Sequence, residues 1–491
     1  MNFSSLTFLS LFFPVSIVLF YLMMFFEKKF KVLKKLRLSD LLLILMSLVF
    51  YAWGDIRGAF VLIVLLLIIY IFSLLLSSLK NHSEKVQKTI LALALIIPIV
   101  VLIHFKYSRW LNKIFFKELS FSLPVNTWTM LGISFIVFSA ISYLIDIYRG
   151  DAKAKFIDAA LYMTFFPKII SGPIVLYRDF AAQLKTRKYN PDKFVSGINL
   201  IIIGLAKKVI LADSFGRVVA EIEKQGNSIT AGIAWACLLL YTLQIYHDFS
   251  GYSDIAIGLA ELFGISIKKN FDFPYTSLSV SEFWRRWHIS LGSFLREYIY
   301  FPLGGSRKGR TRTYINLFIV FLISGIWHGT GFAYLFWGIL HGVCVVIERM
   351  FRSKESDLYT KLKQSKPKYY AYAAVRWLIT MCIVSLGWQF FRLNSFKAAL
   401  KFFGMLIGFG LNDTTMFELP YFLTPKIILL IIIAVLGALF FKHDVFKKLY
   451  IRMNSGKYGF LLQEFALLFL LTVTYVSIVN SSYQPFIYFQ Y

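Results

Sequence analysis

Histidine is the residue type in this chain best suited to proton transfer, and two of its seven copies have unusual neighbours. An imidazole titrates near neutral pH and is able to take a proton from a hydroxyl group. His328 interrupts the apolar run "FLISGIWHGTGFAYLFWGILHG" at residues 321–342. His288 lies in a basic and aromatic stretch, "SVSEFWRRWHISLGSFLREYIYFPLGGSRKG" at 279–309. These two histidines are the first candidates for a chemical role, with a structural role as the competing interpretation.

The other histidines are weaker candidates. Three are predicted at the surface or at the membrane interface: His82, His104 and His443. His341, on the apolar segment after His328, is either a packing residue or a functional one. His247 is equally open, since its neighbour Asp248 is placed to orient the imidazole ring.

The predicted depth of His328 is what favours a functional role. The apolar segment from Tyr314 to Trp327 has about 14 residues, or roughly 21 Å of helix, less than the ~30 Å hydrocarbon layer. We therefore predict that the chain turns inside the membrane at "WHGTG". Nearby glycines are expected to allow the turn and to leave space beside the ring: Gly325, Gly329 and Gly331.

The stretch around His288 has two interpretations. It is either a solvated amphipathic helix or a basic, aromatic wall for an anionic and partly apolar ligand such as a nucleotide thioester. Its charged and aromatic residues are Glu282, Trp284, Arg285, Arg286, Trp287, Phe294, Arg296, Glu297 and Tyr298. The chain has no P-loop and no GxGxxG after a strand, so a nucleotide fold of those kinds is not predicted.

Two apolar runs contain helix-breaking or polar residues. Residues 162–177, "YMTFFPKIISGPIVLY", hold two prolines, a glycine and a lysine, which predicts a re-entrant segment and not a spanning helix. The run 229–263 is predicted to be interrupted at 247–254, "HDFSGYSD". Polar groups at such depth usually face a cavity, which makes Asp248, Ser250 and Tyr252 candidates for lining one.

Composition predicts an all-α polytopic membrane protein. Hydrophobic residues make up 58% of the 491 residues and charged residues only 16%. About twelve transmembrane helices fit the lengths of the apolar runs, beginning within residues 1–26, which lack the basic region and cleavage site of a signal peptide. The others lie near 41–54, 57–78, 89–105, 126–148, 197–214, 229–263, 314–327, 331–350, 371–393, 426–441 and 459–480.

The net charge of +27 comes from short basic clusters between these runs, which indicates membrane topology and not nucleic-acid binding. The basic loop 27–40 is expected to be cytoplasmic, and alternation then makes both termini extracytoplasmic. The same alternation assigns four further segments to the cytoplasm: 149–196, 264–313, 351–370 and 442–457. Residues 105–119 are expected to form an interfacial amphipathic helix.

We expect a single membrane domain over residues 1–491, with an extracytoplasmic tail at 481–491. Neither a disulfide framework nor a metal site is predicted, because the three cysteines lie in apolar stretches without paired spacing: Cys237, Cys344 and Cys382.

Several long motifs, in order, closely resemble the membrane-bound O-acyltransferase family. They are "FFPKIISGPI", "DFSGYSDIAIGLAELFGI", "PYTSLSVSEFWRRWHISLGSFLREYIYFPLGG", "SGIWHG" and "WGILHG". The resemblance covers most of the chain. Within the family, the chain looks like the alginate and peptidoglycan O-acetyltransferase branch. It implies a membrane core with a tunnel, His328 as the principal catalytic residue and His288 as the second. Tunnel or substrate contacts are expected from Trp327, Arg286 and Trp287, together with Asp248, Ser250 and Tyr252.

The resemblance also implies substrates and partners. Acetyl-CoA is the expected donor, docking from the cytoplasm near 268–312, and no cofactor is expected to be bound permanently. The acyl group is expected to pass to an extracytoplasmic serine hydrolase-like (SGNH) partner that acetylates a cell-envelope polysaccharide at the bacterial cytoplasmic membrane. Tyr488 in "FIYF", or Tyr491, is the candidate relay residue, although these aromatics also suit an interfacial belt.

Other functions compete with this one. A D-alanyl transferase for teichoic acid would use a carrier-protein thioester in place of CoA. A transporter would also bury His and Asp in broken helices, but no inverted repeat is visible in the sequence. A scaffold for polymer export without chemistry would tolerate His328→Ala.

Overall fold

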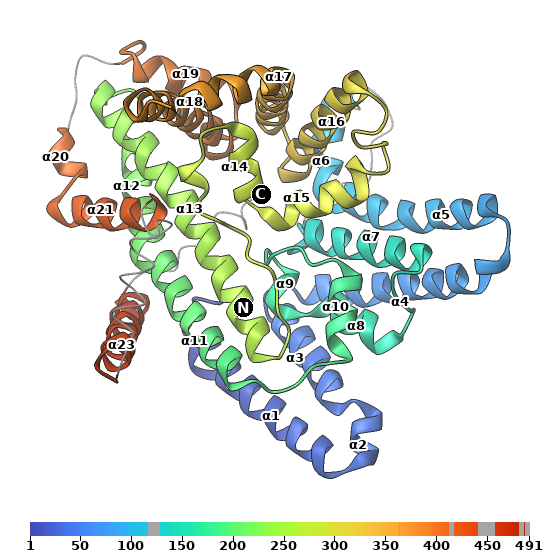
Figure 1. Ribbon diagram of the computed structural model, residues 1–491. Coiled ribbons are helices and arrows are strands. Elements are labelled where there is room, and N and C mark those ends of the chain that lie inside the picture. Colours follow the sequence, from blue (N-terminus) through green and yellow to red (C-terminus); the bar gives the residue numbers. More distant parts are fainter. Residues whose placement is uncertain (116–127, 363, 412–416, 440–456, 481–485, 487–491) are drawn as a thin grey trace. The chain divides into compact units, whose positions relative to one another are not determined.

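The computed structural model describes residues 1–115, 128–362, 364–411, 417–439, 457–480 and 486, with the backbone alone at 31, 115, 352–361 and 457 (Figure 1). Every regular element in these residues is a helix. They form two compact units: unit 1 is the described part of Met1–Gly204, Tyr252–Lys268 and 475–486, and unit 2 is the described part of Leu205–Gly251 and Lys269–Thr474. The predicted all-α class is confirmed, whereas the expectation of a single membrane domain stays a prediction.

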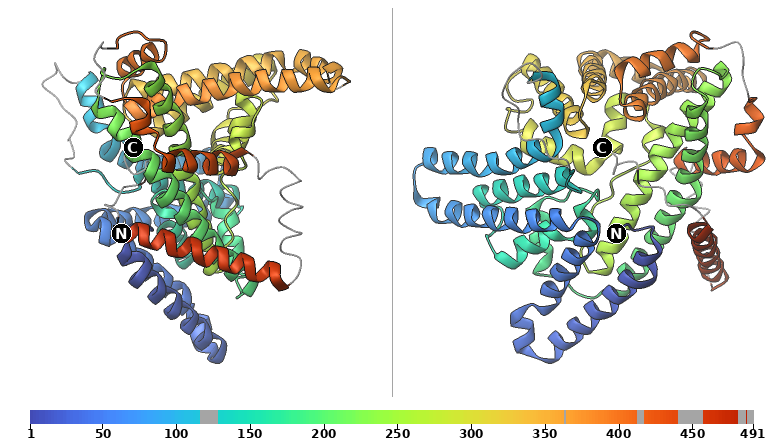
Figure 2. Two further views of the ribbon diagram at one scale, coloured as in Figure 1. Left: turned by 90° about the vertical axis from the view of Figure 1, so that its left-hand side faces the viewer. Right: turned by 180° about the vertical axis from the view of Figure 1, so that it is seen from behind.

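Unit 1 contains the N-terminal helices. Its main elements are η1 (Phe8–Phe12), α1 (Phe13–Lys29), α2 (Lys31–Leu36), α3 (Leu38–Gly54), α4 (Ile56–Ser78), η2 (Leu79–Asn81), α5 (Glu84–Leu102), η3 (Ile103–Tyr107), α6 (Ser108–Phe115), α7 (Ile133–Arg149), α8 (Phe156–Thr164), α9 (Phe166–Ile169) and α10 (Tyr177–Leu184). Helices α4, α5 and α7 pack side by side (Figure 2).

Three helices contribute residues to both units: α11 (Pro191–Ala206), α13 (Ala231–Leu262) and α23 (Lys457–Asn480). Unit 2 holds η4 (Lys207–Ala212), α12 (Asp213–Lys224), η5 (Pro274–Thr276), α14 (Val280–Arg286), α15 (Ile289–Leu295), η6 (Arg296–Tyr300), α16 (Arg310–His328), α17 (Phe332–Leu362), α18 (Lys366–Leu393), α19 (Phe396–Leu406), α20 (Leu419–Phe422) and α21 (Pro425–Leu439).

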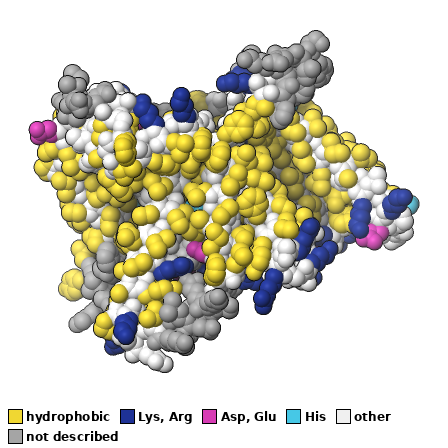
Figure 3. Space-filling model, turned by 90° about the horizontal axis from the view of Figure 1, so that it is seen from above, with side chains coloured by type: hydrophobic (Ala, Val, Ile, Leu, Met, Phe, Trp, Pro, Cys, Tyr) yellow, Lys and Arg dark blue, Asp and Glu magenta, His cyan; other side chains and the backbone are white. Residues whose placement is uncertain are grey.

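Seven helical stretches among the described residues are long and apolar enough to cross a membrane: Phe8–Lys29, Ile56–Asn81, Glu84–Ile114, Pro191–Lys224, Phe332–Phe351, Lys366–Leu393 and Tyr458–Asn480. Leu38–Gly54 and Pro425–Leu439 are shorter apolar helices. Apolar side chains cover most of the face in Figure 3, where Lys and Arg side chains occur in small groups. The chain is a multi-pass membrane protein, and the predicted amphipathic helix at 105–119 continues α5 as far as it is described.

Helix α13 corrects one expectation. It runs unbroken from Ala231 to Leu262, 32 residues, straight through the polar stretch 247–254. A helix satisfies its backbone groups internally, so polar side chains do not break it when they find partners. Asp248 has such a partner, because Lys208 Nζ lies 2.7 Å from its Oδ1.

The segment 162–177 is broken, as its prolines predict. It passes from α8 through a turn to the single-turn helix α9, which has Pro167 in its first turn, and then to α10. Lys168 is only 4% exposed in this segment. Its ammonium group donates to Ser139 Oγ at 2.8 Å and lies 4.0 Å from the centroid of the Tyr162 ring.

Helices α16 and α17 form a closely packed hairpin. Gly325 and Gly338 face each other where a Cβ on Gly325 would lie 2.5 Å from Tyr334 O, and one on Gly338 2.7 Å from Phe321 O. Small residues at a contact between two helices allow such close backbone approach. The turn between the helices depends on Gly331, whose φ of +130° lies in the region that favours glycine.

Candidate active site

His328 is the last residue of α16, at the closed end of the hairpin. Its ring is 4% exposed and lies among three aromatic rings, with centroid distances of 4.8 Å to Trp327, 5.1 Å to Trp337 and 5.0 Å to Phe391. Helix α16 has 19 residues, about 28 Å, so the predicted 14-residue helix was too short. The helix extends through the basic residues that precede Tyr314, and its length alone therefore no longer places His328 at mid-membrane.

The glycines near His328 also act differently from the prediction. Gly325 lies within α16 and allows close helix packing. The Tyr334 ring occupies the space next to Gly329 that a side chain would take. Only Gly331 takes a turn conformation. At Gly329 the prediction of open space was wrong, because the Tyr334 ring occupies it.

His288 lies between α14 and α15 in a left-handed backbone conformation, with φ of 47°. Its Nδ1 is 3.2 Å from Asn270 Oδ1, and that oxygen also accepts from Ser290 N at 3.1 Å. A backbone N–H only donates, so the side-chain atom of Asn270 that faces Ser290 N must be the amide oxygen. Since this oxygen only accepts, Nδ1 of His288 must carry the proton and donate to it. Burial lowers the pKa of His288 to about 3, so the ring is neutral at physiological pH with its lone pair on Nε2.

Trp327 joins the two predicted catalytic histidines. Its ring centroid is 6.2 Å from that of His288 and 4.8 Å from that of His328. Phe249 packs edge-on against His288 at 4.7 Å. The structure therefore brings His288, Trp327 and His328 into one buried cluster within unit 2.

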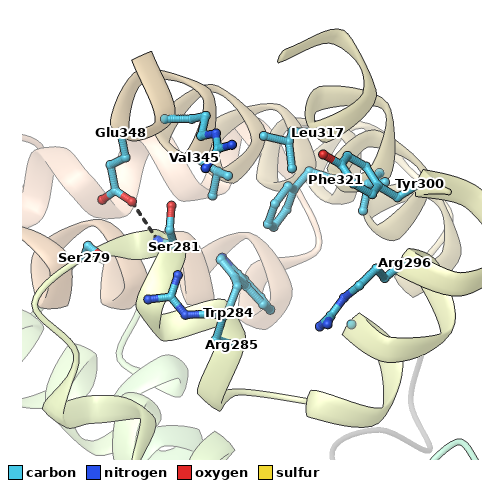
Figure 4. Close-up of a pocket in the computed structure, with 13 residues that line it drawn as sticks. Ser279, Ser281, Trp284, Arg285, Arg296, Tyr300, Leu317, Phe321, Val345 and Glu348 are labelled. Carbon is cyan, nitrogen blue, oxygen red and sulfur yellow. Dashed lines mark hydrogen bonds between the residues drawn. The ribbon is translucent and has the colours of Figure 1, made fainter. Parts of the chain in front are cut away.

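A cavity of about 450 Å³ opens elsewhere in unit 2, lined by residues of α14, α15, η6, α16 and α17 (Figure 4). Three guanidinium groups line it, those of Arg285, Arg296 and Arg349, and none of them forms an ion pair within the described residues. Glu348 is committed to the fold, since its carboxylate accepts from Val280 N and Ser281 N, both at 2.8 Å. The cavity is therefore basic and suits an anionic ligand.

Local sequence explains why α14 presents Trp284 and Arg285 to the cavity. Ser279 caps the helix by accepting from Glu282 N at 3.0 Å, and the Glu282 carboxylate accepts from Leu278 N, an arrangement close to a capping box. Arg286 then bonds Glu282 one turn earlier at 2.8 Å. Of the basic pair, Arg286 thus stabilises the helix and Arg285 faces the cavity (Figure 4).

Two helical faces lead from this cavity to His328. Leu317 and Phe321 of α16 line the cavity, and Ser324 and His328 follow on the same face at spacings of three and four residues. On α17 the corresponding face carries Glu348, Val345, His341 and Trp337. From Glu348 to Trp337 this face spans about 16 Å along the axis.

The remaining predicted residues lie in several places. Trp287 packs against Trp388 at 4.7 Å, and Asp248 pairs with Lys208. Ser250 is buried in unit 2, whereas Tyr252 belongs to unit 1 and contacts Phe486 at 4.7 Å. Tyr488 and Tyr491 lie outside the described residues.

His247 is not oriented by Asp248. Its Nε2 lies 3.3 Å from Ala434 O, and its Nδ1 has no hydrogen-bond partner in the described part of the chain. Sequence analysis also did not single out Trp337, Glu348 or Arg349. The sequence contained a signal for two of them, because Trp337, His341, Val345 and Glu348 follow one another at spacings of three or four residues and so share one helical face.

Comparison with known proteins identifies the protein family. The model of the membrane-bound O-acyltransferase family matches residues 151–388. The chain is 36% identical to the probable alginate O-acetylase AlgI of Pseudomonas putida, covering 100% of both chains. It is 33% identical to the peptidoglycan O-acetyltransferase of Helicobacter pylori over 74% of this chain and 73% of that one. It is 28% identical to the teichoic acid D-alanyltransferase of Bacillus subtilis over 46% of this chain and 61% of that one.

The chain belongs to the membrane-bound O-acyltransferase family. It is an acyltransferase embedded in the membrane, as the motifs around His288 and His328 predict.

Proposed function

We propose that this protein moves an acetyl group from a cytoplasmic thioester, through the bacterial cytoplasmic membrane, for O-acetylation of a cell-envelope polysaccharide of the alginate or peptidoglycan type. The full-length similarity to an alginate O-acetylase supports acetyl transfer over D-alanyl transfer, for which the similarity covers under half of the chain. The observation that carries the proposal is the buried His328 at the end of two helical faces that begin at a basic cavity.

In the proposed reaction, His328 removes the proton from an acceptor hydroxyl. The oxygen attacks the thioester carbonyl, a C–O bond forms and the C–S bond breaks. The leaving thiolate takes the proton back from His328, so the products are an ester and a free thiol. Acetyl-CoA is the proposed donor, with its phosphates near Arg285, Arg296 and Arg349.

His288 is assigned to the acceptor. Since Nδ1 donates to Asn270, Nε2 of the neutral ring offers a lone pair and accepts a hydrogen bond from a hydroxyl. An oxyanion requires a donor, which this tautomer does not provide at Nε2. This favours holding the acceptor hydroxyl over stabilising the tetrahedral intermediate.

We propose further that both termini are extracytoplasmic and that Tyr488 relays the acyl group to an outer serine hydrolase-like partner. Phe486, two residues earlier, is 1% exposed and packs on Tyr252, itself in contact with Phe3 at 5.0 Å. The buried position of Phe486 supports this role more than a lipid-facing aromatic belt does. Tyr488→Phe is expected to abolish polymer acetylation while donor hydrolysis by purified protein continues; full polymer acetylation would overturn the relay.

The test of the proposed function is acetate release by mild alkali from cell-envelope polysaccharide, in cells with wild-type protein or His328→Ala at matched membrane levels. Loss of general base catalysis is expected to lower ester content by about 10²–10⁴-fold, with normal polymer yield. The polymer that loses acetate identifies the substrate. Unchanged acetate would favour a transporter or a scaffold, and loss of D-alanine in place of acetate would favour D-alanyl transfer.

A further inference from the structure

A cluster of buried nitrogen groups lies between the basic cavity and His328. His341 is 0% exposed, and neither ring nitrogen has a hydrogen-bond partner among the residues described. The indole Nε1 groups of Trp284, Trp337 and Trp388 also have none in that part of the chain. The His341 ring contacts two of these indoles, with centroid distances of 5.1 Å to Trp284 and 5.0 Å to Trp337.

Two less buried indoles of unit 2, the exposed Trp235 and the half-buried Trp377, do have hydrogen-bond partners. Trp235 Nε1 donates to Leu406 O at 2.9 Å, and Trp377 Nε1 donates to Tyr275 O at 2.8 Å. A buried polar group without a hydrogen bond costs about 1–3 kcal/mol, which is why such groups are rare in folded proteins. Four of them in one cluster favour a polar ligand over a packing role.

The position of the cluster indicates which part of a ligand it contacts. Trp284 lines the basic cavity, and Trp337 contacts both Trp284 at 5.2 Å and His328 at 5.1 Å. His341 occupies the same face of α17, one turn from Trp337 and one turn from the cavity residue Val345. A ligand with its anionic end among the arginines and its reactive end at His328 would pass this cluster.

Gly387 on α18 makes room for the His341 ring. A Cβ at this position would lie 2.8 Å from His341 Nε2. Glycine in a helix interior costs roughly 1 kcal/mol relative to alanine, so it needs a compensating reason. Accommodating the His341 ring in this position is such a reason, and a side chain here would displace the ring.

We propose that His341, with the indole N–H groups of Trp284 and Trp337, binds the amide-bearing phosphopantetheine arm of the thioester donor and directs its carbonyl towards His328. The indoles donate to amide carbonyl oxygens of the arm, and the neutral imidazole pairs with an amide N–H or carbonyl. This inference rests on the proposed function and adds the donor-positioning residues. Acetyl-CoA and an acylated carrier protein share this arm, so the cluster serves either source.

The experiment uses the full-length protein purified in detergent, with thiol release measured at a range of donor concentrations. The donors are acetyl-CoA and S-acetyl pantetheine, which has the arm without the nucleotide. His341→Phe keeps an aromatic ring and removes both nitrogens, and is expected to raise KM by about ten-fold for both donors, the effect of losing about 1.4 kcal/mol of binding. His341→Gln is expected to recover part of the loss, and Gly387→Ala to raise KM with the histidine retained.

Two controls make the outcomes distinct. His247→Phe alters another buried histidine of unit 2 and is expected to leave KM unchanged. Arg285→Gln is expected to raise KM for acetyl-CoA alone, because S-acetyl pantetheine has no nucleotide to pair with the cavity arginines.

The result that overturns the inference is an unchanged KM in His341→Phe and Gly387→Ala while the wild type is active. A loss of kcat and of thermal stability equal to that of His247→Phe would likewise make His341 a packing residue. No thiol release by the wild type with either donor would instead count against the proposed function.

Discussion

Unit 2 buries two polar clusters that differ in how their groups are satisfied. Lys208 lies on η4 and pairs with Asp213 Oδ1 and Asp248 Oδ1, both at 2.7 Å, and Lys208 and Asp248 are each 2% exposed. The cluster of His341 and its indoles is neutral, and within the described chain its nitrogens are not hydrogen-bonded. The first cluster is complete without a ligand, whereas the second is not.

The difference teaches that burial alone does not identify a functional polar residue. Charges buried in a membrane protein are often functional, and η4 is a π-helix, a feature frequent at functional sites. Here, however, Lys208 lies at hydrogen-bond distance from both Asp213 and Asp248, so each of these charges already has a partner. Proximity to a cavity and unmet hydrogen bonds single out the histidine and tryptophan cluster instead.

The largest expected effect separates these roles. Lys208→Met leaves two carboxylates buried without their cation, which is expected to destabilise the fold by about 3–5 kcal/mol. The measurement is thermal unfolding in detergent and the yield of monodisperse protein. His328→Ala is the matched control and is expected to destabilise the fold less, because its ring packs among aromatic residues and its removal leaves Lys208 with Asp213 and Asp248.

The fully neutral triple variant Lys208→Met, Asp213→Asn, Asp248→Asn sharpens the comparison. Replacing a whole buried ion network is often close to neutral for stability, so this variant is expected to fold and to retain polymer acetylation. A stable triple variant without acetylation would restore Asp248 as a tunnel residue, as the sequence suggested.

Most of the membrane helices were predictable because apolar length is a strong signal. The errors in α13 and α16 share a cause: charged and polar residues were taken as ends of helices. The chain extends α16 through Arg310 and Arg312, and it continues α13 past Asp248. Helices need apolar side chains only where they meet lipid, and a partner such as Lys208, 40 residues away, is invisible to a local pattern.

The candidate site was predictable in part. The motifs located His288 and His328, and the spacing of Leu317, Phe321, Ser324 and His328 was legible as one helical face. The direction in which each helical face points could not be predicted from the sequence, since it depends on how α14, α16 and α17 pack. For the same reason the ion pairs of Arg286 with Glu282 and Asp272 and the place of Arg349 in the cavity were not predicted, and the ligand contact of Arg286 stays a prediction.

His288 is intermediate between the two clusters, because hydrogen bonding at Nδ1 fixes its ring. Asn270→Ala removes the acceptor at Nδ1, so the ring loses its preference for the tautomer with a lone pair on Nε2. We expect kcat to fall by about ten-fold, the effect of about 1.4 kcal/mol, with KM for the donor unchanged. The measurement is steady-state thiol release with saturating acceptor.

Asn270→Asp tests the same bond through pH. A carboxylate still accepts from Nδ1, so activity at neutral pH is expected to persist, but its negative charge favours the imidazolium and raises the pKa of His288. Because the reaction needs the neutral ring, the acidic limb of kcat/KM is expected to move to higher pH than in the wild type, where the pKa is about 3. A purely structural Asn270 would lower activity in both variants without moving this limb, and the assignment of His288 to the acceptor hydroxyl would then fail.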